Sequence, residues 1–471
     1  MIGLEEKIEP PPLPLRKRLT VNFAANLFAI ACTVVVQLGS VPIFLFFWSK
    51  ESYGEWLLIS AIPTYLALAE AGFATTAGNE IGMAVAEGKM ERARCSLHTA
   101  WGFIVTVSII VLGLASIASF AVPWTKWLGL CVLEAGEVRW VMLLLSFYTV
   151  VGLLYSILGA VYRAGYKNAR IAFLTNTGRL IEFVTMAASV AMSQSMITLS
   201  RNMLAIRVAM ALVVYFDSRR ISPTLNLGLT AFCAKELKRT WQPSVLFMAM
   251  SLGNAFYLQG MTLLVGIRLG AGAVVIFNTT RTLTRTIVQF VALIKHSTFI
   301  EFAYLFGAGE FAKARRLNGL VFEISWVVSV TSALVVYLVG PWVMSAWTNH
   351  AVEIDRALLS IFLLSAVLNS IWFIFSGLLQ GVNRHERLAI LYLLATSASL
   401  LMGVLLVRPF GLVGVAWAMV VCEMLLVPFI IQDTCRLMQC SPRELLTDAL
   451  YLEQSFSLLR HFAGRHFPKN S

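Results

Sequence analysis

Two arginines lie deep in an apolar segment, and their spacing suits the binding of an anionic group. Arg281 is the eleventh residue of a segment that begins at 271, roughly 15 Å from its start in a helix, and Arg285 lies one turn further on. With Asn278, Thr282 and Gln289 they share one helical face. Since burying an arginine in a bilayer costs at least about 2.5 to 3.5 kcal/mol, we expect this face to line a cavity that binds a phosphate or diphosphate. The alternative is a structural ion pair with an acid on another helix.

Other ionisable residues in apolar segments are candidates for coupling or for structural pairing. Glu182 follows Arg179 by three residues, a spacing that lets the two pair on one helix face. Arg207 has no local partner of this kind and is a second cavity candidate. Glu70 could bind a coupling proton or cation, or stabilise a neighbouring arginine. Glu423 is a further acid that could pair with an arginine.

The elements that must position these side chains are membrane helices. Of the 471 residues, 58% are hydrophobic and 13% are charged, whereas soluble domains have about two apolar residues for each charged one. A spanning helix needs about 20 residues, so a dozen spans leave no room for a separate soluble catalytic domain. The seven cysteines are scattered without a CxxC pair, and no Walker motif occurs. We therefore expect no metal, no cofactor and no enzymatic activity.

Hydropathy predicts twelve spans, and the distribution of charge predicts their orientation. The spans are 21–48, 53–82, 98–122, 140–162, 171–193, 199–216, 241–267, 271–294, 317–347, 357–380, 388–407 and 411–432. The N-terminus and the loops after even-numbered spans carry 21 Lys and Arg residues, Lys295 among them, against 7 on the opposite side. This asymmetry predicts that both termini are cytoplasmic. The net charge of +12 is then a consequence of topology and does not indicate a nucleic-acid partner.

The two halves of the chain contain an internal repeat. Five residues of one loop recur 221 positions later: Glu80, Gly88, Arg92, Ala93 and Arg94 match Glu301, Gly309, Lys313, Ala314 and Arg315. Six spans separate the copies, so the repeat is parallel, with its axis along the membrane normal. The sequence therefore predicts an all-α polytopic membrane protein of about 12 transmembrane helices, in two six-helix bundles around a central cavity, that works by alternating access.

The repeat and the composition also divide the chain. We predict a cytoplasmic N-terminal segment at 1–20, an N-terminal bundle at 21–216, a cytoplasmic linker at 217–240, a C-terminal bundle at 241–435 and a cytoplasmic amphipathic tail at 436–471. Within the tail, Ser441 and Glu444 have the spacing of a capping box, with Pro442 at the first helical position. An amphipathic helix is expected to follow.

Several short stretches resemble a known family. Residues 53–58 (YGEWLL), 66–73 (LALAEAGF) and 379–384 (LQGVNR), together with Gly88 and the basic loop at 92–94, resemble bacterial polysaccharide flippases of the multidrug/oligosaccharidyl-lipid/polysaccharide exporter superfamily. Such proteins move polyprenyl-diphosphate-linked oligosaccharides, such as O-antigen or exopolysaccharide units, to the periplasmic leaflet of the inner membrane. The resemblance implies that Arg281 and Arg285 meet the lipid diphosphate. Family members commonly have aspartate where this chain has Glu70.

The resemblance also implies partners. These are an undecaprenyl-type lipid-linked oligosaccharide, membrane lipid, and a polysaccharide polymerase or chain-length machinery.

Three other functions remain as alternatives. A multidrug exporter of the same superfamily is the first alternative, although it should prefer acidic cavity residues for cationic drugs. A membrane glycosyltransferase or polymerase is disfavoured by the short outer loops. A 12-span sugar or ion symporter is disfavoured because residues 89–94 (KMERAR) lack an Asp-Arg-x-Gly-Arg element.

Overall fold

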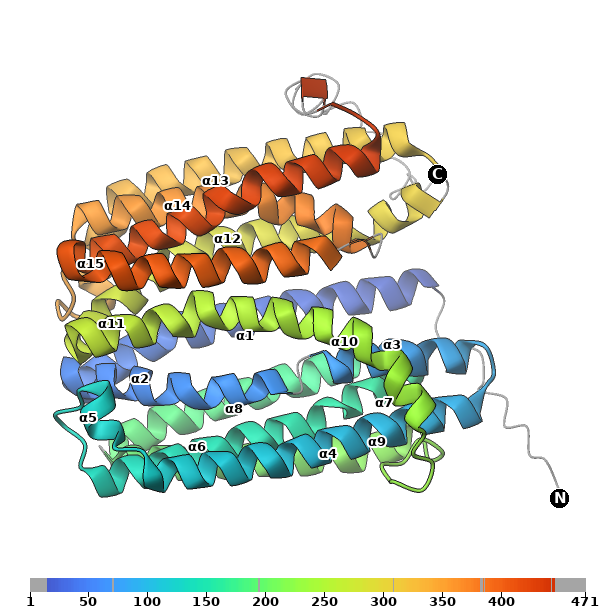
Figure 1. Ribbon diagram of the computed structural model, residues 1–471, viewed down its shortest axis with the longest axis horizontal. Coiled ribbons are helices and arrows are strands. Elements are labelled where there is room, and N and C mark those ends of the chain that lie inside the picture. Colours follow the sequence, from blue (N-terminus) through green and yellow to red (C-terminus); the bar gives the residue numbers. More distant parts are fainter. Residues whose placement is uncertain are drawn as a thin grey trace, which may run out of the picture. The chain divides into compact units, whose positions relative to one another are not determined.

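In the computed structural model the chain is helical in nearly every part that is described (Figure 1). The structure describes residues 15–69, 72–193, 195–307, 309–381, 384, 386–441 and 443–444. Over these ranges no strand occurs, and each predicted span falls on one helix or on consecutive helices. A backbone in hydrocarbon must satisfy its N–H and C=O groups internally, and a helix does so within one segment. The predicted fold class is confirmed.

The described chain divides into two compact units. The first ends at Asn278 and also includes Ala346–Val352, and the second comprises Thr279–Ser345 and the chain from Glu353 onward. The first unit contains α1 (Leu15–Phe47), α2 (Lys50–Leu66), α3 (Phe73–Ala86), α4 (Met90–Ala121), α5 (Trp124–Leu128), α6 (Ala135–Ser156), α7 (Leu158–Ala164), α8 (Asn168–Met192), α9 (Met196–Ile221), α10 (Ala234–Ala255) and α11 (Met261–Leu269). Most of α12 (Ala271–Gly307) belongs to the second unit, with α13 (Phe311–Trp347), α14 (Arg356–Gly381) and α15 (Glu386–Met438).

Several predicted spans contain breaks. The span predicted at 53–82 is α2, a 3-10 turn (Ala67–Ala69) and α3, and the span at 241–267 is α10, a π-helical turn (Phe256–Gly260) and α11. The long α15 contains a non-helical Gly411 with φ 56° and ψ −136°, which separates the last two predicted spans. Within the described residues, seven stretches are long and apolar enough to cross a membrane: Leu27–Phe47, Met90–Ala121, Ala135–Ala164, Met196–Ile221, Phe311–Trp347, Arg356–Gln380 and Glu386–Met438.

Helix boundaries repeat along the chain at the spacing that the sequence predicted. Three pairs of helix starts are each 221 residues apart, namely Lys50 and Ala271, Met90 and Phe311, and Ala135 and Arg356. Since loops tolerate insertions, equal spacing at three helix starts in chain order indicates duplicated halves. The parallel repeat is therefore visible in local structure as well as in sequence.

The turn before Met90 and the turn before Phe311 have the same geometry in both copies. Gly88 has φ 73° and Gly309 has φ 74°, a backbone conformation that glycine adopts without strain. In both copies the residue after the glycine donates its N–H to the carbonyl five residues before it, Lys89 to Ala84 at 2.8 Å and Glu310 to Leu305 at 2.9 Å. The glycine match in the sequence therefore reflects one conserved turn, which reverses the chain between consecutive helices.

Each unit has an apolar core that holds its helices together. In the first unit Ile81, Leu97, Ile104 and Val161 are buried together from α3, α4 and α7. In the second unit, side chains of α12, α13 and α14 form one cluster around the fully buried Ile287, and α14 packs along α15 (Figure 1). The core around Ile287 holds α12, which carries Arg281 and Arg285, and a further cluster in the first unit packs Val214 of α9 and Leu174 of α8 against α7.

The predicted capping box at the end of the described chain is present. The N–H of Ser441 donates to Glu444 Oε2 at 2.8 Å, and the N–H of Glu444 donates to Ser441 Oγ at 3.2 Å. These hydrogen bonds to the carboxylate hold the pKa of Glu444 below its usual range. The amphipathic helix predicted beyond it falls at 445–471, outside the described residues, as does the N-terminal segment at 1–14.

Candidate functional site

The two predicted cavity arginines lie in the interior of α12. Arg281 is 9% exposed, and Arg285, one turn further on, is half-buried. Thr280, Thr284 and Ile287, on other faces of the same turns, are at most 1% exposed. Both guanidinium groups are therefore carried by a stretch of helix that is packed inside the second unit; that they line a binding cavity stays a prediction.

Arg285 has no acid as a partner in the part of the chain that is described. No carboxylate among the described residues lies within 4.0 Å of its guanidinium. Tyr392 of α15 lies within electrostatic range of Arg285. Glu423, also of α15, accepts hydrogen bonds from Asn369 Nδ2 at 3.2 and 3.1 Å and from Trp372 Nε1. Among the described residues, then, none neutralises the charge of Arg285 through a direct ion pair.

The other polar residues predicted on this face differ in surroundings. Asn278, which belongs to the first unit, accepts a hydrogen bond from Thr262 Oγ1 at 3.0 Å through its Oδ1 and so joins α12 to α11. Gln289 is half-buried, one turn beyond Arg285. Their predicted binding role stays a prediction.

Arg207, the second predicted cavity cation, lies in a polar cluster inside the first unit. Its Nε lies 2.9 Å from Glu182 Oε1, and its terminal nitrogens donate to Glu182 Oε2 at 3.0 Å, to the Tyr155 hydroxyl at 2.9 Å and to the Tyr148 hydroxyl. The guanidinium also lies 4.1 Å from the centroid of the Tyr148 ring. An adjoining cavity of about 10 Å³ holds about one water molecule. A structural ion pair accounts for these contacts.

The pairing predicted for Glu182 was wrong. Its guanidinium partner is Arg207 of α9, whereas Arg179 is exposed and donates to Asn176 Oδ1 at 3.4 Å. The i,i+3 spacing made the pairing on α8 sterically possible, but Glu182 is buried against α9, where the Arg207 guanidinium reaches it. The coupling role predicted for Glu182 therefore has to operate from within an ion pair. Glu70, the other predicted coupling acid, lies outside the described residues.

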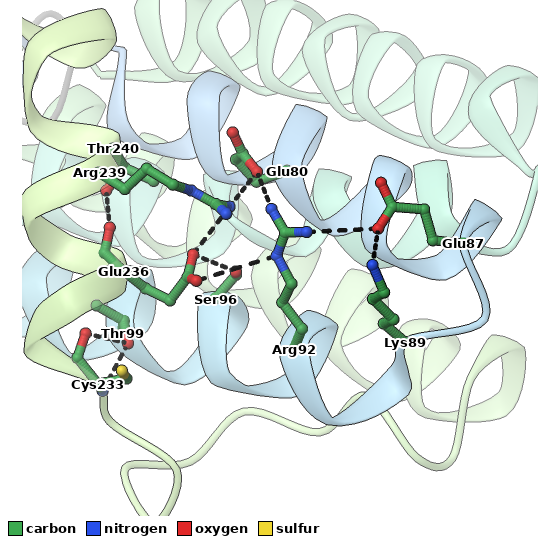
Figure 2. A network of polar contacts seen from close by, with 10 residues as sticks. All are labelled: Glu80, Glu87, Lys89, Arg92, Ser96, Thr99, Cys233, Glu236, Arg239 and Thr240. Carbon is green, nitrogen blue, oxygen red and sulfur yellow. Dashed lines mark hydrogen bonds and ion pairs between the residues drawn. The ribbon is translucent and has the colours of Figure 1, made fainter.

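The acidic and basic residues of the repeated loop form a network of ion pairs (Figure 2). Arg92 of α4 lies 3.4 Å from Glu80 of α3, 3.4 Å from Glu87 and 4.0 Å from Glu236 of α10. Arg239 of α10 contacts Glu80 and lies 2.9 Å from Glu236. The network therefore ties α10 to α3 and α4 at the end of the first unit predicted to be cytoplasmic.

At the edge of this network Lys89 hydrogen-bonds to Glu87 at 2.8 Å, and this contact holds the pKa of the Glu87 carboxyl below its usual range. Both side chains are well exposed. Exposed pairs of this kind contribute little individually, so the connection between α10 and α3 depends mainly on the inner carboxylates Glu80 and Glu236.

Two buried ionisable residues were missed by the sequence analysis. Glu55 is 1% exposed and accepts hydrogen bonds from the backbone N–H groups of Val132 at 2.7 Å and Leu133 at 3.0 Å. Lys295, predicted as a loop charge, is 4% exposed, because α12 continues to Gly307 instead of ending near 294. An unbroken helical pattern through 295–307 was the signal that could have placed Lys295 inside the bundle.

Comparisons with known proteins agree with this architecture. No protein-family model matches the sequence, and no curated protein is similar to it in sequence. Among solved structures, the chain is similar to the inward-facing conformation of a multidrug resistance MATE family transporter of the MOP superfamily, with a TM-score of 0.72 and 14% identity over 90% of this chain and 99% of that one. The outward-facing conformation of such a transporter gives a TM-score of 0.63 at 14% identity, over 93% and 99% of the chains.

A third similar structure is a MOP superfamily transporter from Pyrococcus furiosus, for which a reversed polarity of the binding pocket is described as suggesting a different function. The TM-score is 0.66 at 12% identity, over 93% of this chain and 99% of that one. At such low identity the likeness shows the fold, which is that of MATE transporters of the MOP superfamily. The helical fold is therefore shared with multi-pass membrane proteins that are described as transporters.

Proposed function

Starting from the fold shared with MOP superfamily transporters, we propose that this protein is a flippase for polyprenyl-diphosphate-linked oligosaccharides. The observation that carries the proposal is Arg285, which is half-buried in α12, one turn from Arg281, with no carboxylate within 4.0 Å among the described residues. A buried cation without an acid partner is costly, and an anionic ligand would offset that cost. Two guanidinium groups one turn apart suit a diphosphate, because each can bind phosphate oxygens bidentately.

The proposed cycle is transport by alternating access without covalent chemistry. The oligosaccharide headgroup enters from the cytoplasm, Arg281 and Arg285 hold its diphosphate, and the lipid tail stays in the bilayer. The repeated halves then rearrange so that the headgroup leaves on the periplasmic side of the bacterial inner membrane. With both termini cytoplasmic, the network around Glu80 and Glu236 lies on the loading side.

Drug export is the second candidate, because the fold is shared with multidrug transporters. Cationic drugs require an available acid in the cavity. Among the acids that the structure describes within the predicted spans, Glu182 pairs with Arg207, Glu423 accepts hydrogen bonds from Asn369 and Trp372, and Glu55 accepts backbone N–H groups. Glu323 of α13 also has an interaction partner. This distribution of charge favours an anionic substrate. A glycosyltransferase or polymerase remains disfavoured by the short outer loops.

The proposal is tested with the full chain in proteoliposomes that contain a fluorescent polyprenyl-diphosphate-linked oligosaccharide. A membrane-impermeant quencher reports the fraction of probe that changes leaflet. The Arg281→Ala/Arg285→Ala variant is expected to flip the probe at least about tenfold more slowly, since losing hydrogen bonds to a charged group costs about 1.5 to 3 kcal/mol each. Arg281→Lys/Arg285→Lys should fall between this variant and the wild type.

The matched control is Arg408→Ala, which removes an exposed arginine from the same unit and should leave the rate unchanged. A double variant with full activity would show that the arginines have no role in binding. If the wild type moves a cationic dye but not the lipid probe, drug export replaces flipping as the function. In cells, the double variant should accumulate lipid-linked oligosaccharide on the cytoplasmic face.

A further inference from the structure

Lys295 is a buried amine without an acid partner among the described residues. Its side chain is 4% exposed, and no described carboxylate lies within 4.0 Å of its Nζ. The contacts of Nζ are neutral: it donates to Ser376 Oγ at 2.9 Å and lies 3.9 Å from the centroid of the Phe373 ring. The long side chain of a lysine would ordinarily extend its amine to water, and that of Lys295 does not.

The surface of α14 is shaped to receive this amine. Phe373, Ser376 and Gly377 are spaced as i, i+3 and i+4, so they share one face of the helix. The Ser376 hydroxyl donates its own proton to the Phe373 carbonyl at 2.6 Å, which leaves its oxygen lone pairs for Lys295. A Cβ at position 377 would lie 3.0 Å from Lys295 Cγ, so the glycine makes room for the stem.

Charged groups on the neighbouring elements do not neutralise Lys295. The described contacts of its Nζ on α14 include no titratable group. Within the second unit, Glu323 of α13 and Glu423 of α15 form no ion pair with Lys295 within 4.0 Å. Arg281 and Arg285, on α12 itself, are of like charge. In contrast, the buried Arg207 of the first unit pairs directly with Glu182.

The difference between the two buried cations has a chemical meaning. A guanidinium stays protonated in proteins, so a buried arginine needs an acid or an anionic ligand. An amine has a second option, because it can release its proton and remain as a neutral hydrogen-bonding group. The surroundings of Lys295 suit both forms of the amine. The face of the Phe373 ring and the Ser376 hydroxyl oxygen stabilise an ammonium, and both can equally lie beside a neutral amine.

We propose that Lys295 is a proton-binding site that couples transport to the proton gradient, an inference that rests on the proposed flippase function. The amine takes a proton from water on the outer side and releases it to water on the cytoplasmic side, so one proton moves inward in each cycle. With Lys295 neutral, the loaded protein moves the anionic headgroup outward. With Lys295 protonated, the empty protein returns with one more positive charge. A membrane potential that is negative inside favours both steps.

The test measures flipping of the fluorescent lipid probe in proteoliposomes with and without an imposed proton gradient. The wild type is expected to flip about tenfold faster with the gradient, which corresponds to 1.4 kcal/mol. Lys295→Gln and Lys295→Arg should flip at rates within about twofold of the wild type without the gradient and gain nothing from it, because neither side chain exchanges a proton in this range. Lys313→Gln, which removes an exposed lysine paired with Glu310 at 2.7 Å, should respond like the wild type.

The outcomes separate this inference from the function on which it rests. Acceleration that persists in Lys295→Gln, or a wild type that flips the probe equally with and without the gradient, overturns the coupling role and leaves the flippase proposal standing. A wild type that does not flip the probe overturns both. If the Lys295 variants do not fold, Ser376→Ala serves instead. It removes an acceptor that favours the ammonium, so the midpoint of the pH–rate profile should move to lower pH, and an unchanged midpoint contradicts the proposal.

Discussion

At the scale of single residues, the surroundings of each buried charge distinguish a structural role from a binding role. Arg207 contacts a carboxylate and two tyrosine hydroxyls, whereas Arg285 has no described acid within 4.0 Å. The two arginines were equivalent candidates in the sequence. Because a buried ion pair stabilises mainly by avoiding an uncompensated charge, each partner of Arg207 should matter for folding more than for binding.

Replacing Glu182 tests that assignment. Glu182→Ala leaves Arg207 buried and unpaired, so we expect the protein to lose about 3 to 5 kcal/mol of stability, and Glu182→Leu/Arg207→Leu should recover most of the loss. The thermal unfolding midpoint in detergent measures both effects. Arg179→Ala, which removes the exposed arginine of the same helix, is the control and should change stability by less than about 0.5 kcal/mol. Equal effects of Glu182→Ala and Arg179→Ala would show that the pair is not structural.

At the scale of elements, close approach between helices depends on glycine. A Cβ at Gly54 of α2 would lie 2.1 Å from the carbonyl oxygen of Ala271, and a Cβ at Gly266 of α11 would lie 2.0 Å from Leu58 Cδ2. Small residues allow membrane helices to pack at such distances. The contact of α2 with α11 and with the start of α12 therefore needs a residue without a side chain at these positions.

Gly54→Ala is expected to disrupt this contact. The backbone of Ala271 cannot move aside as a flexible side chain would, so we expect the free energy of unfolding to fall by about 1 to 3 kcal/mol. The measurement is the thermal unfolding midpoint, together with the yield of monodisperse protein, and both should be lower. Gly136→Ala is the matched control, because the added Cβ would meet nothing within 4 Å in the first turn of α6. It should be neutral or slightly stabilising. If the Gly54→Ala variant is as stable as the Gly136→Ala variant, α2 does not approach the backbone of Ala271 as closely as described.

At the scale of the whole molecule, the orientation in the membrane can be tested with cysteine labelling. Cys131, in the loop between α5 and α6, is exposed, and the charge asymmetry predicts that this loop lies on the periplasmic side. A variant that retains only Cys131 should react with a membrane-impermeant maleimide in intact spheroplasts. A cysteine-free variant with Lys238→Cys, at an exposed position of α10, should react only after permeabilisation. The opposite pattern would invert the predicted topology.

The breaks within spans were harder to predict than the spans themselves. Hydropathy placed one span at 53–82, where the structure has α2 and α3 separated near Gly72 (φ 102°). It also placed one span over α10 and α11 without indicating the π-helical turn between them. Both breaks keep their flanking segments apolar, so a window average does not detect them. The end of α12 was predicted too early for the opposite reason, since Lys295 lowered the hydropathy of a helix that continues.

The sequence by itself determined the all-helical membrane fold, the approximate spans, the parallel repeat at 221 residues and the capping box at Ser441. These features follow from composition, periodicity and local hydrogen bonding, which act over neighbouring residues. The tertiary structure decided that Glu182 pairs with Arg207, that Lys295 is buried against Ser376, and that Arg285 has no acid beside it in the described chain. Those outcomes depend on which helix faces pack together, and residues far apart in the chain meet only when the apolar cores have formed.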